Sequence, residues 1–252
     1  MHEPSKYKSS ILGTVARFPL KLIPRETELR VIKGPVKGKK WISGSSNHGC
    51  WLGTYELGKQ KAFIAMVRPG TVVYDLGAHV GFYTLLASTL VGPKGQVFAF
   101  EPLPKNLNYL RRHLEMNAIA NCSVWEVAVG REEGIAGFDC DTGVHNFEGQ
   151  LVYDAPGDFE TSVVAIDPLV NSGKLPPPDV IKCDIEGAEY DAFFGASETL
   201  AKYGPTILLA THSPLIHQQC CEFLSALGYK LSSLDERPLA QTTELLATRS
   251  RS

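Results

Sequence analysis

A glycine turn that follows a buried apolar run carries the clearest chemical signal in this sequence. Residues 71–76 read TVVYDL, and the chain continues as Gly77-Ala78-His79-Val80-Gly81. A parallel sheet binds ligands at the carboxyl ends of its strands, and glycines at such an end let the backbone approach a ligand closely. The pattern is not G-x-G-x-x-G, because Ala78 or His79 stands at the middle glycine. The turn therefore favours a ligand other than a hydride-transfer dinucleotide.

An acid closes the next apolar run. Glu101 ends QVFAFE, 24 positions after Gly77. At the end of a second strand, an acid accepts hydrogen bonds from both hydroxyls of a ribose. The turn and the acid together suit a nucleoside with a small charged tail, and S-adenosylmethionine is such a ligand. Its ribose fits the acid and its methionine part fits the turn. In the alternative interpretation, Glu101 only solvates a loop.

A second cluster of charged residues stands where the apolar run 179–183 ends. Alternation places Lys182, Asp184 and Glu186 on one side of the strand and its exit. One acid would bind the cofactor's ammonium while the other orients or deprotonates an acceptor, or both would hold a divalent cation. In a third alternative, Glu186 only caps the following helix. With no third ligand evident, the sequence predicts no metal site.

Histidine adds a candidate base. His212 follows TILLAT, another apolar run, and an imidazole pKa near 6.5 suits proton removal at neutral pH. Its alternative role is that of a hydrogen-bonded loop residue. His217, one turn into the next predicted helix, and His145, in an irregular segment, are weaker candidates. We therefore expect Asp184, Glu186 and His212 to lie near the reacting group.

Composition excludes several classes of protein. The 252 residues carry 25 Lys and Arg against 27 Asp and Glu, a formal net charge of −2, so no global field attracts nucleic acid or anionic lipid. The six cysteines form no C-x-x-C pair, which predicts reduced thiols rather than zinc ligands or disulfides. No apolar run approaches the ~20 residues of a membrane span, and no signal peptide is visible. We expect a cytoplasmic protein with no nucleic-acid partner and no membrane span.

Strands and helices alternate from residue 71 onward, which is typical of βαβ units. Right-handed crossovers between such units give an α/β fold with a doubly wound, mostly parallel sheet. Apolar strand segments are predicted at 71–76, 96–102, 122–129, 162–170, 179–187, 205–212 and 229–234. Helices are predicted at 54–68 with Thr54 as N-cap, and at 80–91, 104–118, 188–204 and 213–228.

The remaining segments define the expected domain boundaries. Residues 1–50 are predicted to form an N-terminal helical and hairpin extension, with the hairpin at 28–43 and a possible role as substrate cover. The catalytic domain is expected at 51–240. Residues 131–160, rich in Gly, Asp and Glu, are predicted as a hairpin or cover segment, and 241–252 as a loose C-terminal tail.

Four motifs in order resemble the FkbM-type methyltransferases over residues 50–235. They are DLGAHVGFYT from Asp75, FAFEPLPKNLNYLRRHLEMN from Phe98, WEVAVG from Trp125 and IKCDIEGAEYDAFFGA from Ile181. The resemblance implies S-adenosylmethionine as cofactor and O-methylation, often of sugars or natural products. It also implies a seven-stranded, Rossmann-like class I methyltransferase sheet, with six strands parallel and one antiparallel.

The resemblance also extends the expected site. Tyr55-Glu56 is similar to a Tyr-Glu pair of the family, and in this architecture the Trp125–Ala128 segment brackets the adenine. The family usually has Asn where His79 stands, and often a Glu beside the His at the fifth strand's end, where this chain has Thr211. The expected cofactor-binding residues are Glu56, Asp75, Gly77, Ala78, His79, Gly81, Phe82, Glu101, Pro102, Glu126, Ala128 and Asp184.

The sequence thus predicts an S-adenosylmethionine-dependent methyltransferase that acts on a hydroxyl of a small molecule, such as a sugar or natural product. Asp184, Glu186 and His212 are its expected catalytic residues. Two rivals remain at this point. One is an NAD-dependent oxidoreductase on the same kind of sheet, and the other is a non-catalytic module that binds S-adenosylmethionine. The acceptor's identity and the oligomeric state stay open.

Overall fold

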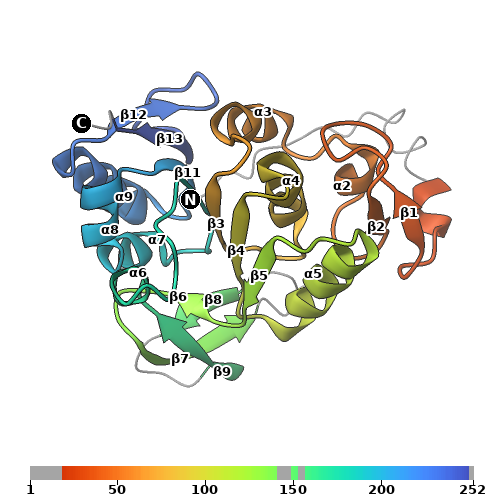
Figure 1. The fold of residues 1–252 in the computed structure, drawn as a ribbon, viewed down its shortest axis with the longest axis horizontal. Helices are drawn as coiled ribbons and strands as arrows, with labels where there is room; N and C mark the ends of the chain where they lie inside the picture. Colours follow the sequence, from red (N-terminus) through yellow and green to blue (C-terminus); the bar gives the residue numbers. More distant parts are fainter. Residues whose placement is uncertain (1–18, 141–148, 153–156, 250–252) are drawn as a thin grey trace, which may run out of the picture. The chain divides into compact units, whose positions relative to one another are not determined.

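The computed structural model describes residues 19–140, 149–152 and 157–249. The chain divides into two compact units, Met1–Tyr55 and Glu56–Ser252. The predicted domain boundary after residue 50 lies close to this division and stays a prediction. The second unit also includes the part of the segment 241–252 that the structure describes. Figure 1 labels the elements of both units.

The first unit contains the predicted hairpin. Strand β1 (Glu28–Arg30) pairs antiparallel with β2 (Lys40–Ile42), which confirms a hairpin within residues 28–43. The Ser43 hydroxyl follows β2 and donates to the carbonyl of Pro24 at 2.7 Å. The remaining elements of the unit are the 3-10 helix η1 (Pro19–Leu22) and the short helix α2 (Gly49–Leu52). Residues 1–18 of the predicted extension lie outside the described residues.

The second unit is built on a seven-stranded sheet in the order β12-β13-β11-β10-β3-β4-β5. Strands β11, β10, β3, β4 and β5 pair in parallel, whereas β13 is antiparallel to both β11 and β12. In this sheet β13 alone runs against the other strands, which confirms the predicted doubly wound, mostly parallel architecture. The strands are β3 (Val72–Leu76), β4 (Gln96–Phe100), β5 (Cys122–Trp125), β10 (Val180–Cys183), β11 (Thr206–Ala210), β12 (Lys230–Ser233) and β13 (Glu244–Thr248).

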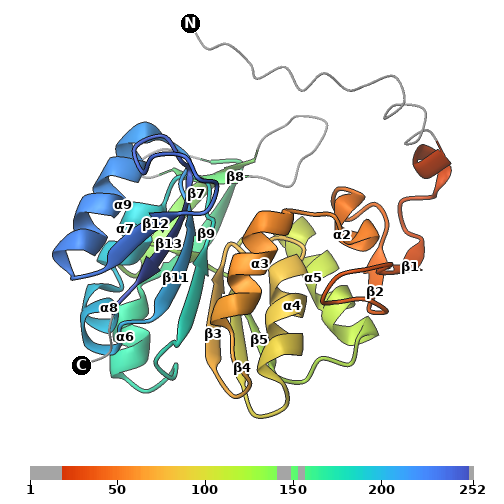
Figure 2. The ribbon, with the colours of Figure 1, turned by 90° about the horizontal axis from the view of Figure 1, so that it is seen from above.

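Helices cover both faces of this sheet (Figure 2). On one face lie α3 (Leu57–Met66), α4 (Phe82–Val91) and α5 (Pro104–Met116). On the other lie α6 (Ile166–Asn171), α7 (Glu189–Phe194), α8 (Ser197–Tyr203) and α9 (Pro214–Ala226). Burial of the apolar strand residues between these layers supplies the main driving force for the fold. No helix among the described residues has the length and apolar character that a bilayer crossing requires.

A second sheet of four strands, in the order β6-β9-β7-β8, corrects two strand predictions. The segment 122–129 is not one strand, because β5 ends at Trp125 and β6 (Ala128–Val129) belongs to the second sheet. The segment 162–170 does not extend the main sheet, because β9 (Phe159–Val164) pairs with β6 and β7 (Gly134–Cys140) and helix α6 follows.

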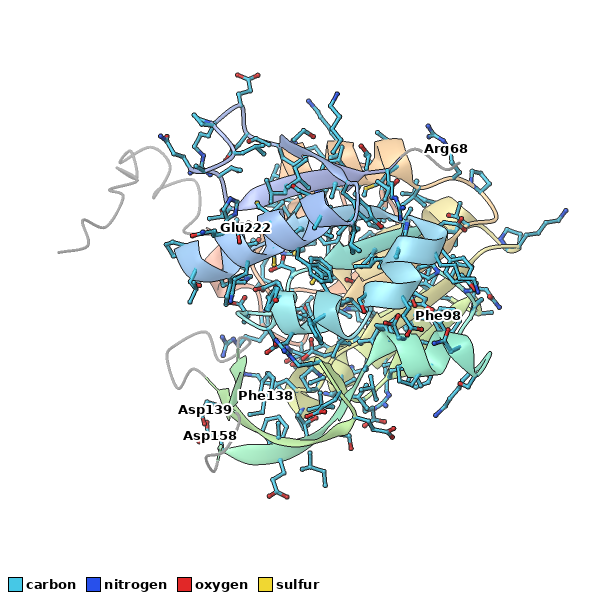
Figure 3. The ribbon with its side chains drawn as sticks, turned by 90° about the vertical axis from the view of Figure 1, so that its left-hand side faces the viewer. Arg68, Phe98, Phe138, Asp139, Asp158 and Glu222 are labelled. Atoms are coloured by element: carbon cyan, nitrogen blue, oxygen red, sulfur yellow. The ribbon has the colours of Figure 1, made fainter. Side chains whose placement is uncertain are left out.

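The insert 131–160 contains the hairpin that the sequence predicts. Strand β7 pairs antiparallel with β8 (Gly149–Val152). On the other side of β7, Phe138 packs against Phe159 of β9 with ring centroids 5.3 Å apart. Figure 3 labels Phe138 in this sheet. The insert therefore supplies β7 and the edge strand β8 of the second sheet. The parts of the insert at 141–148 and 153–156 lie outside the described residues.

Three further element predictions need correction. Helix α3 begins at Leu57 after Glu56, which has a left-handed φ of 39°, so Thr54 is not its N-cap. The predicted helix 188–204 is two helices, because the Asp167 carboxylate accepts from the backbone N–H groups of Glu198 and Thr199 and so starts α8 anew. The predicted tail contains β13, a strand of the main sheet.

The tight turn after β3 predicts a specific sensitivity to substitution at Gly77. Gly77 has a φ of +75°, and a Cβ there would lie 1.9 Å from the Asp184 carbonyl oxygen. Gly70 has a similar φ of +85°, but its Cβ would meet nothing within 4 Å. Gly70→Ala should therefore cost only the left-handed strain, about 1–2 kcal/mol of unfolding free energy. Gly77→Ala should cost about 2–5 kcal/mol, because overpacking against the backbone is added. Urea unfolding of both variants measures the difference, and equal losses would contradict the close approach.

Candidate functional site

Most of the predicted site residues gather where β3, β4, β10 and β11 end. At the end of β3, the backbone N–H groups of Gly77 and Ala78 both donate to the Phe100 carbonyl, at 3.0 and 2.9 Å. Asp75 is fully buried just before the turn, and its Oδ2 accepts from the Thr84 hydroxyl at 2.6 Å. The turn is thus fixed by hydrogen bonds to β4 and to helix α4.

A buried lysine joins this turn to the neighbouring strand. The Lys182 ammonium lies 3.3 Å from Asp75 Oδ1 and donates to the Gly77 carbonyl at 2.7 Å. Burial opposes the charge on Lys182, but the carboxylates of Asp75 and Asp184 raise its pKa and keep it protonated. The charge of Lys182 thereby holds the exit of β3 against β10.

Glu101 is buried directly after β4. Its carboxylate accepts from the backbone N–H of His79 at 2.7 Å and of Leu103 at 3.0 Å, and from the Asn106 amide at 3.1 Å. Burial raises its pKa, and these donors oppose that rise. His79 has a φ of +52°, a conformation in which Asn, Asp and His are enriched among non-glycine residues. The Glu101 carboxylate therefore holds the turn after β3, through His79, and the start of α5, through Leu103 and Asn106. Its contact with a ribose stays a prediction.

Other predicted cofactor residues lie at separate places along the same edge. Gly81 and Phe82 stand at the start of α4, and Pro102 follows β4. Glu126 is exposed after β5 and forms an ion pair with Arg111. Ala128 is buried in the second sheet, where it clusters with Ala136 and Val163. The cofactor contacts of this set stay predictions.

Lys59, which the sequence analysis missed, organises the acids around Asp184. Its ammonium lies 3.0 Å from Asp184 Oδ2, 3.2 Å from Glu244 Oε1 and 3.7 Å from Glu56 Oε1. Glu56 Oε2 in turn accepts from the Tyr83 hydroxyl at 3.0 Å. Glu56 and Lys59 are three residues apart, a spacing that signals a possible pair on a helix. The signal was visible in the sequence, but nothing there joined it to Asp184 or to β13.

The charge state of Asp184 follows from these neighbours. Burial alone would raise the pKa of its carboxyl, but the ammonium groups of Lys182 and Lys59 outweigh burial and lower the pKa to about 2. Asp184 is therefore a carboxylate throughout the neutral range. A group with so low a pKa is a poor proton acceptor and a good partner for a cation.

His212 stands among three carboxylates. Its Nε2 lies 3.4 Å from Asp184 Oδ1 and 3.3 Å from Glu186 Oε2, and its Nδ1 lies 2.6 Å from Glu189 Oε1. The structure therefore brings together the three predicted catalytic residues. It adds Glu189, whose Oε1 also accepts from the backbone N–H of Ile185 and Gly187. That role corrects the capping alternative for Glu186, because Glu189 makes the bonds at this turn.

The acids around His212 change its expected titration. Burial would lower the pKa of the imidazole, but the hydrogen bond and charge of Glu189, together with the charges of Glu186 and Asp184, raise it. A raised pKa means that the neutral, proton-accepting form becomes dominant only above the ordinary value of 6.5. Any rate that requires neutral His212 should therefore fall at a higher pH than the unperturbed residue would suggest.

The same three side chains are also close enough for a cation. Asp184, Glu186 and His212 each offer a ligand atom, and these atoms lie within 4.8 Å of one another. His212 is thus a third potential ligand beside the two acids, a role that the sequence analysis did not consider for it. This arrangement of ligand atoms suits either a bound cation or a protonated His212 beside the two carboxylates. The expectation of function without a metal stays a prediction.

The remaining candidates have structural partners or lie outside the described residues. His217 Nδ1 lies 3.1 Å from the Thr211 hydroxyl, and its Nε2 lies 2.7 Å from the Leu239 carbonyl. It therefore ties α9 to the loop before β13. His145 lies outside the described residues. Free thiols, as the sequence predicts, are found at Cys50, Cys122, Cys183, Cys220 and Cys221.

The chain matches known proteins over much of this unit. The family model described as "Methyltransferase FkbM domain" matches residues 75–231. The chain is 27% identical over 129 residues to the hexuronic acid methyltransferase AglP of Haloferax volcanii, covering 51% of each protein. It is 29% identical over 153 residues to the 2-O-methyltransferase NoeI of Sinorhizobium fredii, covering 54% of this chain and 61% of NoeI.

The chain is also similar to a third methyltransferase and to a solved structure. The chain is 27% identical over 163 residues to the 31-O-demethyl-FK506 methyltransferase FkbM of Streptomyces tacrolimicus, covering 52% of this chain and 62% of that protein. The crystal structure of the methyltransferase FkbM from Methylobacillus flagellatus KT aligns with a TM-score of 0.53 at 19% identity, covering 79% of this chain and 53% of that one. The structural likeness supports the fold. The alignments span only about half to three fifths of these relatives.

The ion pairs of Lys59 with three carboxylates predict that Lys59→Met lowers stability. Removing a buried cation from carboxylates that keep some solvent contact should cost about 2–3 kcal/mol of unfolding free energy at pH 7. Because Asp184 titrates near 2 in the folded chain and at 3.8 in the reference state, its stabilisation is present above pH 3.8 and disappears toward pH 2. The deficit of the variant should therefore shrink as the pH falls from 6 to 3. Urea unfolding at several pH values measures it. Lys61→Met, exposed on the same helix, should change stability by less than about 0.5 kcal/mol.

Proposed function

Because the chain belongs to the FkbM methyltransferase family, as its motifs predict, we propose that it transfers a methyl group from S-adenosylmethionine to a hydroxyl. The acceptor we propose is a small molecule such as a sugar or natural product. The similar proteins support this class, since their names are those of a hexuronic acid methyltransferase, a 2-O-methyltransferase and a 31-O-demethyl-FK506 methyltransferase.

The sign of the site's charge carries the proposal for the cofactor. Carboxylates outnumber cationic side chains at the ends of these strands, so the surroundings favour a ligand with net positive charge. S-adenosylmethionine carries a sulfonium and an ammonium against one carboxylate. A dinucleotide instead brings a negative pyrophosphate. The carboxylates are Glu56, Asp75, Asp184, Glu186, Glu189 and Glu244, and the cationic groups are Lys59, Lys182 and His212.

The residues divide the work in this proposal. Asp184, held as a carboxylate by two lysines, binds the ammonium of the cofactor. Glu101 accepts from the ribose hydroxyls, in addition to the backbone donors that it already serves. The turn at Gly77 lets the backbone approach the methionine part. When bound, S-adenosylmethionine supplies a methyl group that its sulfonium already activates.

His212 removes the acceptor's proton. The hydroxyl oxygen forms a bond to the methyl carbon, the electron pair of the carbon–sulfur bond stays on sulfur, and the hydroxyl proton passes to Nε2 of His212. That atom faces Asp184 and Glu186, whose negative charges stabilise the imidazolium that forms. The exposed fraction of the His212 side chain, 25%, leaves it in reach of an acceptor. General base catalysis of this kind contributes about 10²–10⁴-fold to a rate.

The cofactor assignment predicts a selective stabilisation. S-adenosylmethionine and S-adenosylhomocysteine should each raise the melting temperature, because a ligand that binds only the native state stabilises it by mass action. NAD should leave the melting temperature unchanged, since the carboxylates of the site would repel its negative pyrophosphate. Differential scanning fluorimetry with the three ligands measures this. A shift with NAD and none with either sulfur nucleoside would instead favour the oxidoreductase.

The division of labour predicts different kinetic effects for two variants. His212→Ala should leave cofactor affinity nearly unchanged and slow the chemical step about 10²–10⁴-fold. Asp184→Asn should mainly weaken cofactor binding, with a smaller loss of rate. Isothermal titration with S-adenosylhomocysteine measures binding. Release of S-adenosylhomocysteine from S-adenosylmethionine, with a mixture of candidate hydroxyl acceptors, measures turnover.

Three results would redirect the proposal. Normal turnover by His212→Ala at saturating acceptor would make His212 a structural residue and Glu186 the next candidate base. Activity that vanishes with EDTA and returns with magnesium would turn the acids into cation ligands. Cofactor binding by the wild type, without turnover of any acceptor in the mixture, would favour the non-catalytic module.

A further inference from the structure

Glu189 is the most buried of the carboxylates that contact His212. Its side chain is 0% exposed, whereas those of Asp184 and Glu186 are 22% and 31% exposed. One oxygen, Oε1, receives the His212 Nδ1 contact at 2.6 Å and two backbone N–H bonds. The other oxygen, Oε2, is buried and has no hydrogen-bond partner among the described residues. A buried carboxylate with one unsatisfied oxygen is costly to maintain and requires an explanation.

The hydrogen bonds alone do not explain the charge. A neutral amide of the same size has one carbonyl oxygen, which can accept from a backbone N–H and from an imidazole N–H in the same way. It would avoid the cost of burying a negative charge. What only the carboxylate adds at this position is attraction for a positive imidazole. The identity of Glu189 therefore indicates a stage at which His212 is charged.

The contact between Glu189 and Nδ1 also determines which nitrogen of His212 carries the hydrogen. A carboxylate can only accept, so Nδ1 must carry the hydrogen that lies toward Glu189. In the neutral ring the lone pair then belongs to Nε2. Nε2 faces Asp184 and Glu186 on the opposite side of the ring. The proton that the ring gains on reaction therefore enters at Nε2.

We propose that Glu189 is a positioning residue for His212, fixing Nδ1–H toward itself, leaving Nε2 to accept the acceptor's proton, and stabilising the imidazolium that results. The inference rests on the proposed role of His212 as base. Glu189 touches neither cofactor nor acceptor, and it acts only through the ring. It has a second connection to the site, because its backbone bonds hold the turn at 185–187 that presents Glu186.

The charged groups around the ring define what else affects its titration. Glu189 approaches from α7, and Asp184 and Glu186 approach from the segment between β10 and α7. Lys59 on α3 lies behind Asp184 and balances part of its charge. Among the contacts described for the ring, Glu189 alone reaches Nδ1, so its charge can be removed while the Nε2 side stays intact.

The decisive experiment compares Glu189→Gln with the wild type by NMR titration of the His212 imidazole, in EDTA-treated protein. The variant keeps the size of the side chain and an acceptor for Nδ1–H, but it loses the charge. The pKa of His212 should fall by about one to two units, the equivalent of one charge-assisted hydrogen bond. The acid limb of the pH–rate profile should move to lower pH by the same amount. The plateau rate should drop about tenfold or more, with affinity for S-adenosylhomocysteine unchanged.

Glu222→Gln is the matched control. Glu222 is exposed on α9, where it accepts from Gln218 (Figure 3). The same substitution there should leave the His212 titration and the rate unchanged. A purely structural role for Glu189 would lower stability without moving the pKa of His212, and that result would overturn the proposal.

Two further measurements keep the proposal testable in every case. If Glu189→Gln does not fold, the nitrogen chemical shifts of His212 in the wild type still report its tautomer. A neutral form with the hydrogen on Nε2 would overturn the proposal, whereas one with the hydrogen on Nδ1 supports it. If His212→Ala turns over normally, the proposed base fails, but the titration still shows separately whether Glu189 controls the ring.

Discussion

Carboxylates converge where β3, β10 and β11 end, and their mutual repulsion is the constraint on which the rest of the site depends. Two buried ammonium groups offset this repulsion. Lys182 joins Asp75 to the carbonyl of Gly77, and Lys59 joins Asp184 to Glu56 and Glu244. Each lysine contacts residues of different strands or helices. The ion pairs that neutralise the carboxylates therefore also hold these elements together. Loss of either cation would leave neighbouring carboxylates without a compensating positive charge, which would raise their pKa values and destabilise the fold.

The compensation is incomplete on the side of His212, and the chemistry proposed for the site depends on that imbalance. Around this ring the third cation is the imidazole itself, in contact with Asp184, Glu186 and Glu189. The acids favour its protonated form and therefore raise its pKa. A base with a raised pKa is a stronger proton acceptor, but a smaller fraction of it is neutral at a given pH. The same carboxylates thus increase the driving force for proton transfer and shift the working range toward higher pH.

Local sequence patterns predicted the parallel strands and the glycine turn because each depends on neighbours along the chain. The four motifs also carried the family resemblance. The patterns failed where a distant contact decides the outcome. Helix α8 begins anew because Asp167 caps it, β13 exists because β11 and β12 flank it, and Ala128 belongs to the second sheet because it pairs with β9. An isolated segment contains none of that information.

The same distinction explains the candidate site. Asp75, Gly77 and Glu101 could be identified because each stands at the end of an apolar run, so the strand itself places it. Lys59 and Glu189 could not, because their importance lies in partners 125 and 23 residues away in the chain. Glu189 is even part of the motif IKCDIEGAE, yet its spacing alone suggests only a helix start. The groups proposed to bind the cofactor are therefore encoded mostly in local turns. Control of the proton instead depends on side chains that only the folded sheet brings into contact.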